Sequence, residues 1–432
     1  MKKFAILGLA VVLAIAFTMP AMAFDSVFGG YWRTRAYMQK DFSGDDTGSK
    51  DMTLVDTRTR LYYTAIFNEN LKFVNKFEMD AVWGGDKDGY GDIGADGVSV
   101  EVKNSYVDFN LGSVNSKIGV QHYMLARGFL FKDDFAGAVV TFKAEAFEIP
   151  FFWIKAYEGG MGDDMNDYDI DFYGVAPRFS FGNTGSIQPF FVYAFSDDAS
   201  LGAKAYKWPY YYEEIGPSGV VDYTDFEEIN LFTLGFDLDL NFDPVSLWMT
   251  GIYQFGAVDF QDGTDADVSA WLAAVGATAN FDAFDIHGQV FYASGQDEGE
   301  EDIEFFIYLV GQEYYWAEIM GGGIFNDQVS QNAPGYKKIT NTVAYNLGAG
   351  FKATADLSFK LDLWYAHLVE EIEAGLDKEL GTEIDLAVTY KLMKGLKLDI
   401  VGAYLFAGDS TTRDVANDEN PYEIGAQLSL SF

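Results

Sequence analysis

The segment from Tyr422 to Phe432 constrains the fold of this chain more strongly than any other. Its even-numbered residues are Tyr, Ile, Ala, Leu, Leu and Phe, and its odd-numbered residues are Glu, Gly, Gln, Ser and Ser. Successive side chains of a β-strand point to opposite faces, so this strict alternation predicts a strand with one apolar face and one polar face. The apolar face continues as far as Phe432 itself.

The same alternation recurs along the chain. From Phe232 to Phe242 the apolar residues alternate with Thr, Gly, Asp, Asp and Asn, and the segment from Glu383 to Tyr390 repeats the pattern. A charged side chain that faces lipid at the middle of a bilayer costs about 2–4 kcal/mol. We therefore expect the acids on the polar faces to line a water-filled interior: Asp237, Asp239, Glu383 and Asp385.

The links between the predicted strands alternate in length. Short links such as Asn68–Asn70, Gly112–Ser113 and Glu148–Pro150 separate long ones such as Gly84–Gly97 and Gly295–Lys338. Short turns at one end and long loops at the other are typical of bacterial outer-membrane barrels. We predict an all-β fold, a transmembrane antiparallel up-and-down β-barrel of about 18 strands, with about 16 or about 20 as alternatives.

Residues 1–23 have the pattern of a secretory signal peptide. A basic start and an apolar run over Phe4–Phe17 precede a small-residue cleavage site at Ala21–Ala23. We expect residues 24–432 to form the barrel as a single domain. The chain contains no cysteine, which excludes disulfides and thiolate chemistry.

Charge and motif content exclude several classes of function. The formal net charge of −37 argues against nucleic-acid binding, which needs a basic surface. The three histidines show no zinc-ligand spacing, and no nucleophile or nucleotide-binding motif occurs, so we predict neither an enzyme nor a cofactor. The segment Asp86–Asp92 is similar to a calcium loop but lacks the glutamate at its twelfth position, so we predict no defined metal site.

Four of the seven arginines lie in the first two predicted strands. Arg33 and Arg35 share one face of the first strand, and Arg58 and Arg60 share one face of the second. Antiparallel pairing is expected to bring all four together on the interior wall. Two interpretations stay open: a basic ladder that contacts passing solutes, or a network of ion pairs that braces the wall. The carboxylates available for such pairs are Asp56, Glu78 and Asp80.

Two of the long links are too apolar for simple solvated loops. Gln121–Phe135 is expected either to fold into the interior as a constriction or to pack as an apolar cap on neighbouring strands or a partner subunit. In the first case its charged residues would narrow the path: Arg127, Lys132, Asp133 and Asp134. Gly295–Lys338 contains two apolar stretches, and three alternatives stay open for it, namely an interior plug, a subunit contact and an extra hairpin.

The C-terminal segment resembles the closing strand of bacterial outer-membrane barrels, whose terminal phenylalanine is recognised by the barrel-assembly machinery. This resemblance implies that Phe432 is an assembly signal. Gly30–Tyr37 and Asp56–Tyr63 resemble strands of porins from sulfate- and metal-reducing bacteria and, more distantly, of the alginate-export family. The resemblance implies a water-filled channel for passive diffusion of small hydrophilic solutes and ions. The alternatives are an alginate-type export or uptake channel, a barrel sheath around a partner protein, and a soluble β-protein.

The same resemblance implies a location in the outer membrane, in contact with lipid and lipopolysaccharide. General porins are commonly trimers, so it also implies a homotrimer. Most of the acidic residues lie in the long links, for example in Glu370–Glu379. An acidic mouth concentrates cations, so we predict a moderate preference for cations over anions.

Overall fold

The computed structural model describes residues 24–48, 50–85, 100–158, 169–196, 226–260, 263–297, 300–325, 338–372, 375–413 and 417–432. The predicted signal peptide, residues 1–23, and the calcium-loop-like segment Asp86–Asp92 lie outside these ranges. Helical structure in the described chain comprises η1 (Ala126–Gly128), η2 (Gly182–Thr184) and α3 (Asp409–Thr412). None of the described helices is long and apolar enough to cross a membrane.

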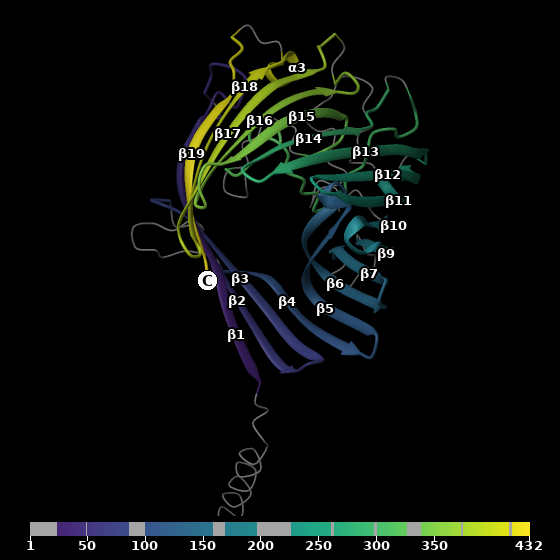
Figure 1. Ribbon diagram of the computed structural model, residues 1–432. Helices are drawn as coiled ribbons and strands as arrows, with labels where there is room; N and C mark the ends of the chain where they lie inside the picture. Colours follow the sequence, from purple (N-terminus) through teal and green to yellow (C-terminus); the bar gives the residue numbers. More distant parts are fainter. Residues whose placement is uncertain are drawn as a thin grey trace, which may run out of the picture.

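One antiparallel sheet contains the strands and closes on itself, because β1 pairs with β19 (Figure 1). Its first half consists of β1 (Asp25–Lys40), β2 (Met52–Asn68), β3 (Leu71–Val82), β4 (Val100–Leu111), β5 (Val114–Leu125), β6 (Phe131–Lys143), β7 (Phe147–Tyr157), β8 (Ile170–Val175), β9 (Arg178–Ser180) and β10 (Gly185–Ser196). Its second half consists of β11 (Phe226–Phe242), β12 (Val245–Phe260), β13 (Asp265–Phe281), β14 (Phe284–Ala293), β15 (Thr342–Lys352), β16 (Leu357–Leu368), β17 (Glu379–Met393), β18 (Leu396–Ala407) and β19 (Tyr422–Ser431).

Two of these labels belong to one strand of the barrel. Ala176 and Pro177 separate β8 from β9, and both pieces pair with β7 and β10. Proline has no backbone N–H to donate, so the ladder is interrupted here. Counted together they give a closed barrel of 18 strands, which confirms the predicted fold class.

One predicted turn is wrong. Glu148–Pro150 lies within β7, and the chain turns instead at Ala144–Ala146, where the Ala144 N–H donates to the carbonyl of Phe147 at 2.9 Å. Pro150 fits in the strand because its carbonyl accepts the Ala176 N–H at 3.1 Å. The other short links join consecutive strands as predicted, for example between β2 and β3 and between β17 and β18.

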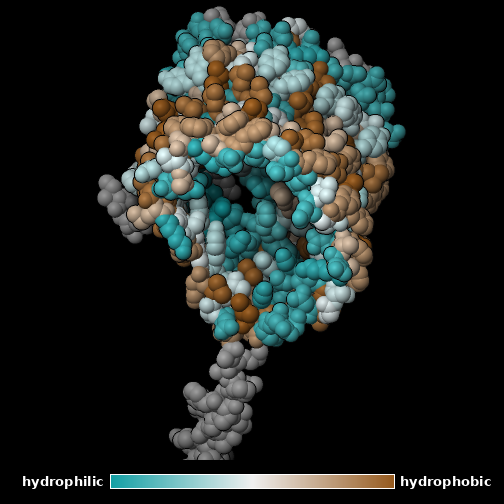
Figure 2. Space-filling model, viewed as in Figure 1, coloured by the Kyte–Doolittle hydropathy of each residue, from teal (hydrophilic) through white to brown (hydrophobic). Residues whose placement is uncertain are grey.

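The outer surface of the barrel carries a band of apolar side chains (Figure 2). Leu234 of β11 and Leu386 of β17 are 46% and 48% exposed, respectively. Asp237 and Asp385 occupy alternate positions on the same strands and are buried inside the barrel. This arrangement places apolar groups where lipid would lie and keeps carboxylates away from it.

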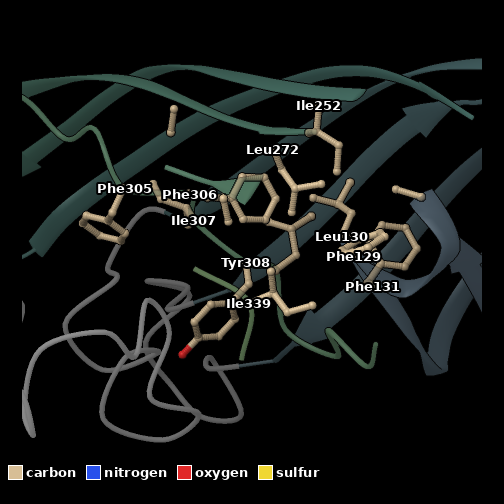
Figure 3. Packing of buried hydrophobic residues seen from close by; sticks show 14 of the residues in the cluster. Phe129, Leu130, Phe131, Ile252, Leu272, Phe305, Phe306, Ile307, Tyr308 and Ile339 are labelled. Carbon is tan, nitrogen blue, oxygen red and sulfur yellow. The ribbon is translucent and has the colours of Figure 1, made fainter. Parts of the chain in front are cut away.

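Part of the interior is filled by an apolar core rather than by water. Figure 3 shows Phe305–Tyr308, from the link between β14 and β15, packed near Ile252 and Leu272 of the wall and near Phe129–Phe131 of the β5–β6 hairpin. All of these side chains are buried. Figure 2 shows an opening into the barrel that is lined mainly by hydrophilic residues.

Candidate functional site

The described part of the link between β14 and β15 folds into the barrel; we call residues Ile303–Phe325 the inward segment. It contains no strand, so an extra hairpin, and with it a barrel of 20 strands, is wrong for the described residues. The segment starts on β13, where Ile303 donates its N–H to the carbonyl of Asp267 at 2.8 Å. It ends near β1, where Phe325 stacks on Tyr37 with ring centroids 4.9 Å apart. It therefore reaches from one part of the barrel wall to another.

A buried glutamine holds the middle of the inward segment. Gln254 of β12 donates to the carbonyl of Ile307 at 2.7 Å and accepts the N–H of Ile307 at 2.8 Å. Gln254 is fully buried. Both backbone groups of Ile307 are satisfied by one side chain, so the apolar residues beside it can be buried without leaving unpaired backbone groups.

Further along, a second glutamine and an aromatic stack join the inward segment to the β5–β6 hairpin. Gln312 donates to the carbonyl of Phe129 at 2.7 Å and accepts the N–H of Ile339 at 2.8 Å. Tyr314 stacks on Phe129 with ring centroids 3.8 Å apart and donates its hydroxyl to Gln289 of β14 at 2.6 Å. The two inserted pieces of chain therefore pack as one unit inside the barrel.

Carboxylates on β17 hold the last part of the inward segment. The two oxygens of Glu383 accept the N–H groups of Ile319 and Met320 at 2.6 and 2.8 Å. Asp385 accepts the N–H of Glu318 at 3.3 Å. Glu383 and Asp385 are both predicted interior acids, and the structure places them against this segment rather than in open solvent.

The β5–β6 hairpin corrects the prediction for Gln121–Phe135. Most of that stretch belongs to β5 and β6, and only Ala126–Leu130 links them, so a long third loop is wrong. The strands persist because each residue from Gln121 to Leu125 pairs with one from Phe131 to Phe135. Leu125, Phe129 and Phe131 are nevertheless buried in the interior core, as an apolar segment requires.

Arg127, at the tip of this hairpin, joins two predicted interior acids. Its guanidinium donates to Asp239 of β11 at 2.7 Å and lies 3.6 Å from Asp237. Asp237 also accepts the hydroxyl of Thr250 at 2.5 Å, and the guanidinium lies over the ring of Trp248, 5.0 Å from its centroid. Arg127 and Asp239 are more than 100 residues apart in the chain, and their contact fixes the tip against the wall.

The other three charged residues predicted for a constriction lie on β6 and do not meet at one point. Lys132 forms an ion pair with Glu313 of the inward segment at 3.4 Å. Asp134 pairs with Lys103 of β4 at 3.1 Å and accepts from Asn104 at 2.8 Å. Asp133 lies next to the inward segment, since a Cβ placed on Gly311 would be 2.9 Å from its own Cβ.

The register of the first two strands brings the predicted arginine cluster together. Arg33 of β1 lies directly opposite Arg58 of β2, and Arg35 lies opposite Asp56. On the next pair of strands Arg58 lies opposite Asp80 and Arg60 lies opposite Glu78. Arginine and carboxylate positions therefore interleave on three adjacent strands.

The described contacts of these arginines are mainly with carboxylates. Arg35 forms a two-point ion pair with Asp56, with Nε 2.9 Å from Oδ1, and donates from Nη1 to the carbonyl of Ile324 at 2.8 Å. Arg58 donates to both oxygens of Asp80 at 2.7 and 2.5 Å. Arg60 pairs with Glu78, which also lies 3.3 Å from Arg58. Most of the positive charge on this wall is therefore neutralised within it.

The sequence analysis did not identify Gln254 and Gln312 as anchors of the inward segment. The sequence of β13 nevertheless indicates that part of the interior is filled. Its inward residues Ala266, Val268, Ala270, Leu272 and Ala274 are apolar and buried, although a strand that faces water on the inside should be polar there. A strand whose inward face is apolar needs an apolar partner inside the barrel. The apolar stretches of Gly295–Lys338 supply it.

Two further features of the described residues bear on chemistry. At the turn end of β3–β6 lies a polar cavity of about 210 Å³, lined by Glu69, Asn70, Lys72, Asp108, Asn110, Asn115, Lys117 and Lys143. Among the residues that the structure describes, no group of three or more His, Asp or Glu side chains is arranged to hold a metal ion.

Comparisons with known proteins give matches by structure alone. No protein-family model and no curated protein sequence matches the chain. The structure of OpdL from Pseudomonas aeruginosa is similar with a TM-score of 0.59 at 12% identity, over 94% of this chain and 99% of that one. The structure of OccAB1 from Acinetobacter baumannii is similar with a TM-score of 0.57 at 11% identity, over 94% of this chain and 97% of that one.

A third similar structure is that of Pseudomonas aeruginosa OccK2 (OpdF) in complex with glucuronate, with a TM-score of 0.58 at 12% identity, over 94% of this chain and 98% of that one. At such identities the similarity concerns the fold. These neighbours are outer-membrane porins. The chain has the 18-stranded barrel fold of outer-membrane porins, and its apolar outer band fits the outer membrane as its location.

Proposed function

We propose that this protein is a porin whose partly filled barrel lets small hydrophilic solutes and ions diffuse passively across the outer membrane. The observation that carries the proposal is the closed barrel with an apolar outer band and a hydrophilic opening (Figure 2). A barrel of this size has room for an aqueous channel, and its opening is lined mainly by hydrophilic residues. Charged side chains along the remaining path then set selectivity.

The charge distribution favours cations and neutral solutes over anions. An anion such as the glucuronate bound by OccK2 would need cationic groups that are not already engaged by carboxylates. Here Arg35, Arg58 and Arg60 bond to wall carboxylates, and Arg127 bonds to Asp239. Together with a net charge of −37, these ion pairs support a moderate preference for cations.

The same ion pairs disfavour the alternative of an alginate-type exporter. Moving a polyanion through the barrel would require a continuous row of guanidinium groups available to its carboxylates. The interleaved Asp56, Asp80 and Glu78 occupy the neighbouring guanidinium groups instead. A barrel that encloses a partner protein would need the inward segment to leave the interior. The hydrogen bonds of this segment to the wall support the channel over that alternative.

Planar bilayer recordings test the proposed function. The mature protein, folded in detergent, is expected to give stepwise conductance under a salt gradient, with a reversal potential of the sign that marks cation preference. In a matched variant, Arg33, Arg35, Arg58 and Arg60 are all replaced by glutamine. If these arginines line the ion path, cation preference increases in the variant. The absence of any conductance from folded protein would contradict the proposal, and clear anion preference would contradict its selectivity.

The partners remain predictions of the same proposal. We propose a homotrimer in contact with lipid and lipopolysaccharide, since large apolar side chains such as Leu347 and Phe351 of β15 are exposed on the barrel and suit either lipid or a second subunit. Mass measurement of the complex in detergent tests the trimer. We also propose that Phe432, which is 64% exposed, is accessible to the assembly machinery before the barrel closes.

A further inference from the structure

The end of the inward segment is held by acids that are themselves crowded together. Glu383, which is 0% exposed, accepts two N–H groups of the segment, and Asp385 accepts a third. Glu318 of the segment accepts the N–H of Ile324 at 2.8 Å. Glu423 of β19 lies within electrostatic reach of Glu318 and Asp385. We call these four residues the carboxylate cluster.

Few positive groups face the carboxylate cluster. Arg35 of β1 acts on Glu423, and Lys360 of β16 acts on Glu318. Arg35 is already paired with Asp56, and Lys360 is already paired with Asp362 at 2.7 Å. Neither cation therefore has its full charge available to the cluster.

The remaining neighbours of the carboxylate cluster add negative charge or are neutral. Asp362 of β16 acts on Glu318 and Asp385 and is itself bonded by His287 of β14 at 2.9 Å. Gln39 of β1 donates to one oxygen of Glu423 at 2.9 Å. One oxygen each of Glu423 and Asp385 is buried without a hydrogen-bond partner. Four full negative charges in such surroundings repel one another strongly.

We propose that the carboxylate cluster is a proton-dependent latch that sets the width of the channel. When the cluster retains protons, the stretch Glu318–Phe325 stays against β17, β19 and β1. When the cluster is fully ionised, repulsion releases this stretch from these strands into the lumen, where it narrows the path. The proposal rests on the proposed channel function, and it adds a regulation that the barrel fold does not by itself imply.

The direction of the pH dependence follows from Glu318, which belongs to the inward segment and not to a membrane-spanning strand. Burial raises the pKa of Glu318 from 4.5 to about 7, against the opposing effect of the Ile324 N–H, and the charge of Asp385 adds to the rise. In the latched state Glu318 is therefore protonated below about pH 7 and charged above it. A released Glu318 in water would have lost its proton already near 4.5. Rising pH consequently favours the released state.

Single-channel conductance measured between about pH 5 and about pH 9 tests the latch. Wild-type protein is expected to show large steps at the acidic end and steps roughly half as large at the alkaline end. Glu318→Gln keeps the oxygen that accepts the Ile324 N–H but cannot ionise, so its steps should stay large at every pH. Glu313→Gln is the matched control, because Glu313 belongs to the same segment and pairs with Lys132; it should behave as wild type.

Uptake of a neutral sugar by proteoliposomes gives a second readout, because the field of titrating surface charges does not act on an uncharged solute. Slower uptake at alkaline pH than at acidic pH in wild type, but not in Glu318→Gln, supports the latch. If Glu318→Gln does not fold, as judged by heat-dependent mobility on a gel, Glu423→Gln replaces it with the same expectation. If conductance and sugar uptake do not change with pH, or change equally in wild type and in the variant, the latch is wrong. That result leaves the proposed channel function standing. The absence of conductance at every pH overturns the channel itself.

Discussion

The Arg35 guanidinium and the Asp56 carboxylate form a two-point ion pair on the inner face of the barrel, and their side chains are only 0% and 3% exposed. The same guanidinium also donates to the backbone carbonyl of Ile324 in the inward segment at 2.8 Å. One side chain thus joins β1, β2 and the inserted chain. Removing one partner of such a pair leaves a buried charge without its counterpart, which is costly.

The first prediction concerns this pair. Arg35→Gln should destabilise the folded barrel by about 3–5 kcal/mol, because Asp56 would stay buried without a cation. Unfolding in urea, monitored as the loss of heat-dependent mobility on a gel, measures the change in stability. The double variant Arg35→Gln with Asp56→Asn should recover part of the loss, since neither charge then remains. Equal stability of the single variant and the wild type would contradict the ion pair.

A second prediction concerns ion selectivity. Asp80→Asn removes the carboxylate that accepts from Nε and Nη2 of Arg58, so the wall gains net positive charge and the reversal potential should shift toward anions. Asp356→Asn, in the turn between β15 and β16, is a matched control with the same loss of charge, and it should shift the reversal potential much less. If the two variants shift it equally, the effect depends on net charge alone and Arg58 is not on the ion path.

A third prediction concerns the seam where the barrel closes. The carbonyl of Phe432 accepts the N–H of Gly30 at 2.9 Å, and its ring covers that glycine. A Cβ on Gly30 would lie 2.4 Å from Cζ of Phe432 and 2.7 Å from the carbonyl oxygen of Arg60, so Gly30→Ala should slow or prevent closure.

The yield of folded barrel in detergent measures the effect of Gly30→Ala. Gly402→Ala is the control, because the nearest atom to a Cβ there is 3.7 Å away and the site should accept it. Equal yields from the two variants would show that the ring of Phe432 moves aside without cost.

A fourth prediction concerns the anchor of the inward segment. Gln254→Leu leaves the N–H and the carbonyl of Ile307 without their partner, at about 1–3 kcal/mol for each group. The segment should then become sensitive to proteases added to folded protein, while the barrel itself stays intact. Gln188→Leu removes a glutamine that donates to Ala176 on the wall, and it should leave the segment protected. Protection that is unchanged in Gln254→Leu would show that the apolar contacts suffice.

Much of the barrel is predictable from local pattern. Alternation along β11 and β17 assigns Asp237 and Glu383 to the face opposite the apolar residues, because the two faces of a strand are set by the backbone alone. Turn residues and link lengths predict the strand order, since antiparallel neighbours joined by short turns have one natural pairing. The arginine cluster is predictable for the same reason, as Arg33 and Arg58 lie in consecutive strands.

The fate of the apolar links is not a local property. Sequence alone leaves Gly295–Lys338 open between a plug, a subunit contact and a hairpin, because apolar residues specify burial but not the surface that buries them. The tertiary structure decides it by placing Gln254 and Glu383, which are 53 and 64 residues from their partners, where they satisfy backbone groups of the inward segment.

Sequence by itself therefore determined the closed antiparallel barrel, its apolar outer face and its acidic inner positions, since these follow from the period of a strand and from the cost of charge in lipid. Only the tertiary structure decided that the β5–β6 hairpin and the inward segment fill part of the interior, that Arg35 pairs with Asp56, and that Glu318 meets three carboxylates of the wall. Those features depend on contacts between strands and links far apart in the chain, which no local pattern encodes.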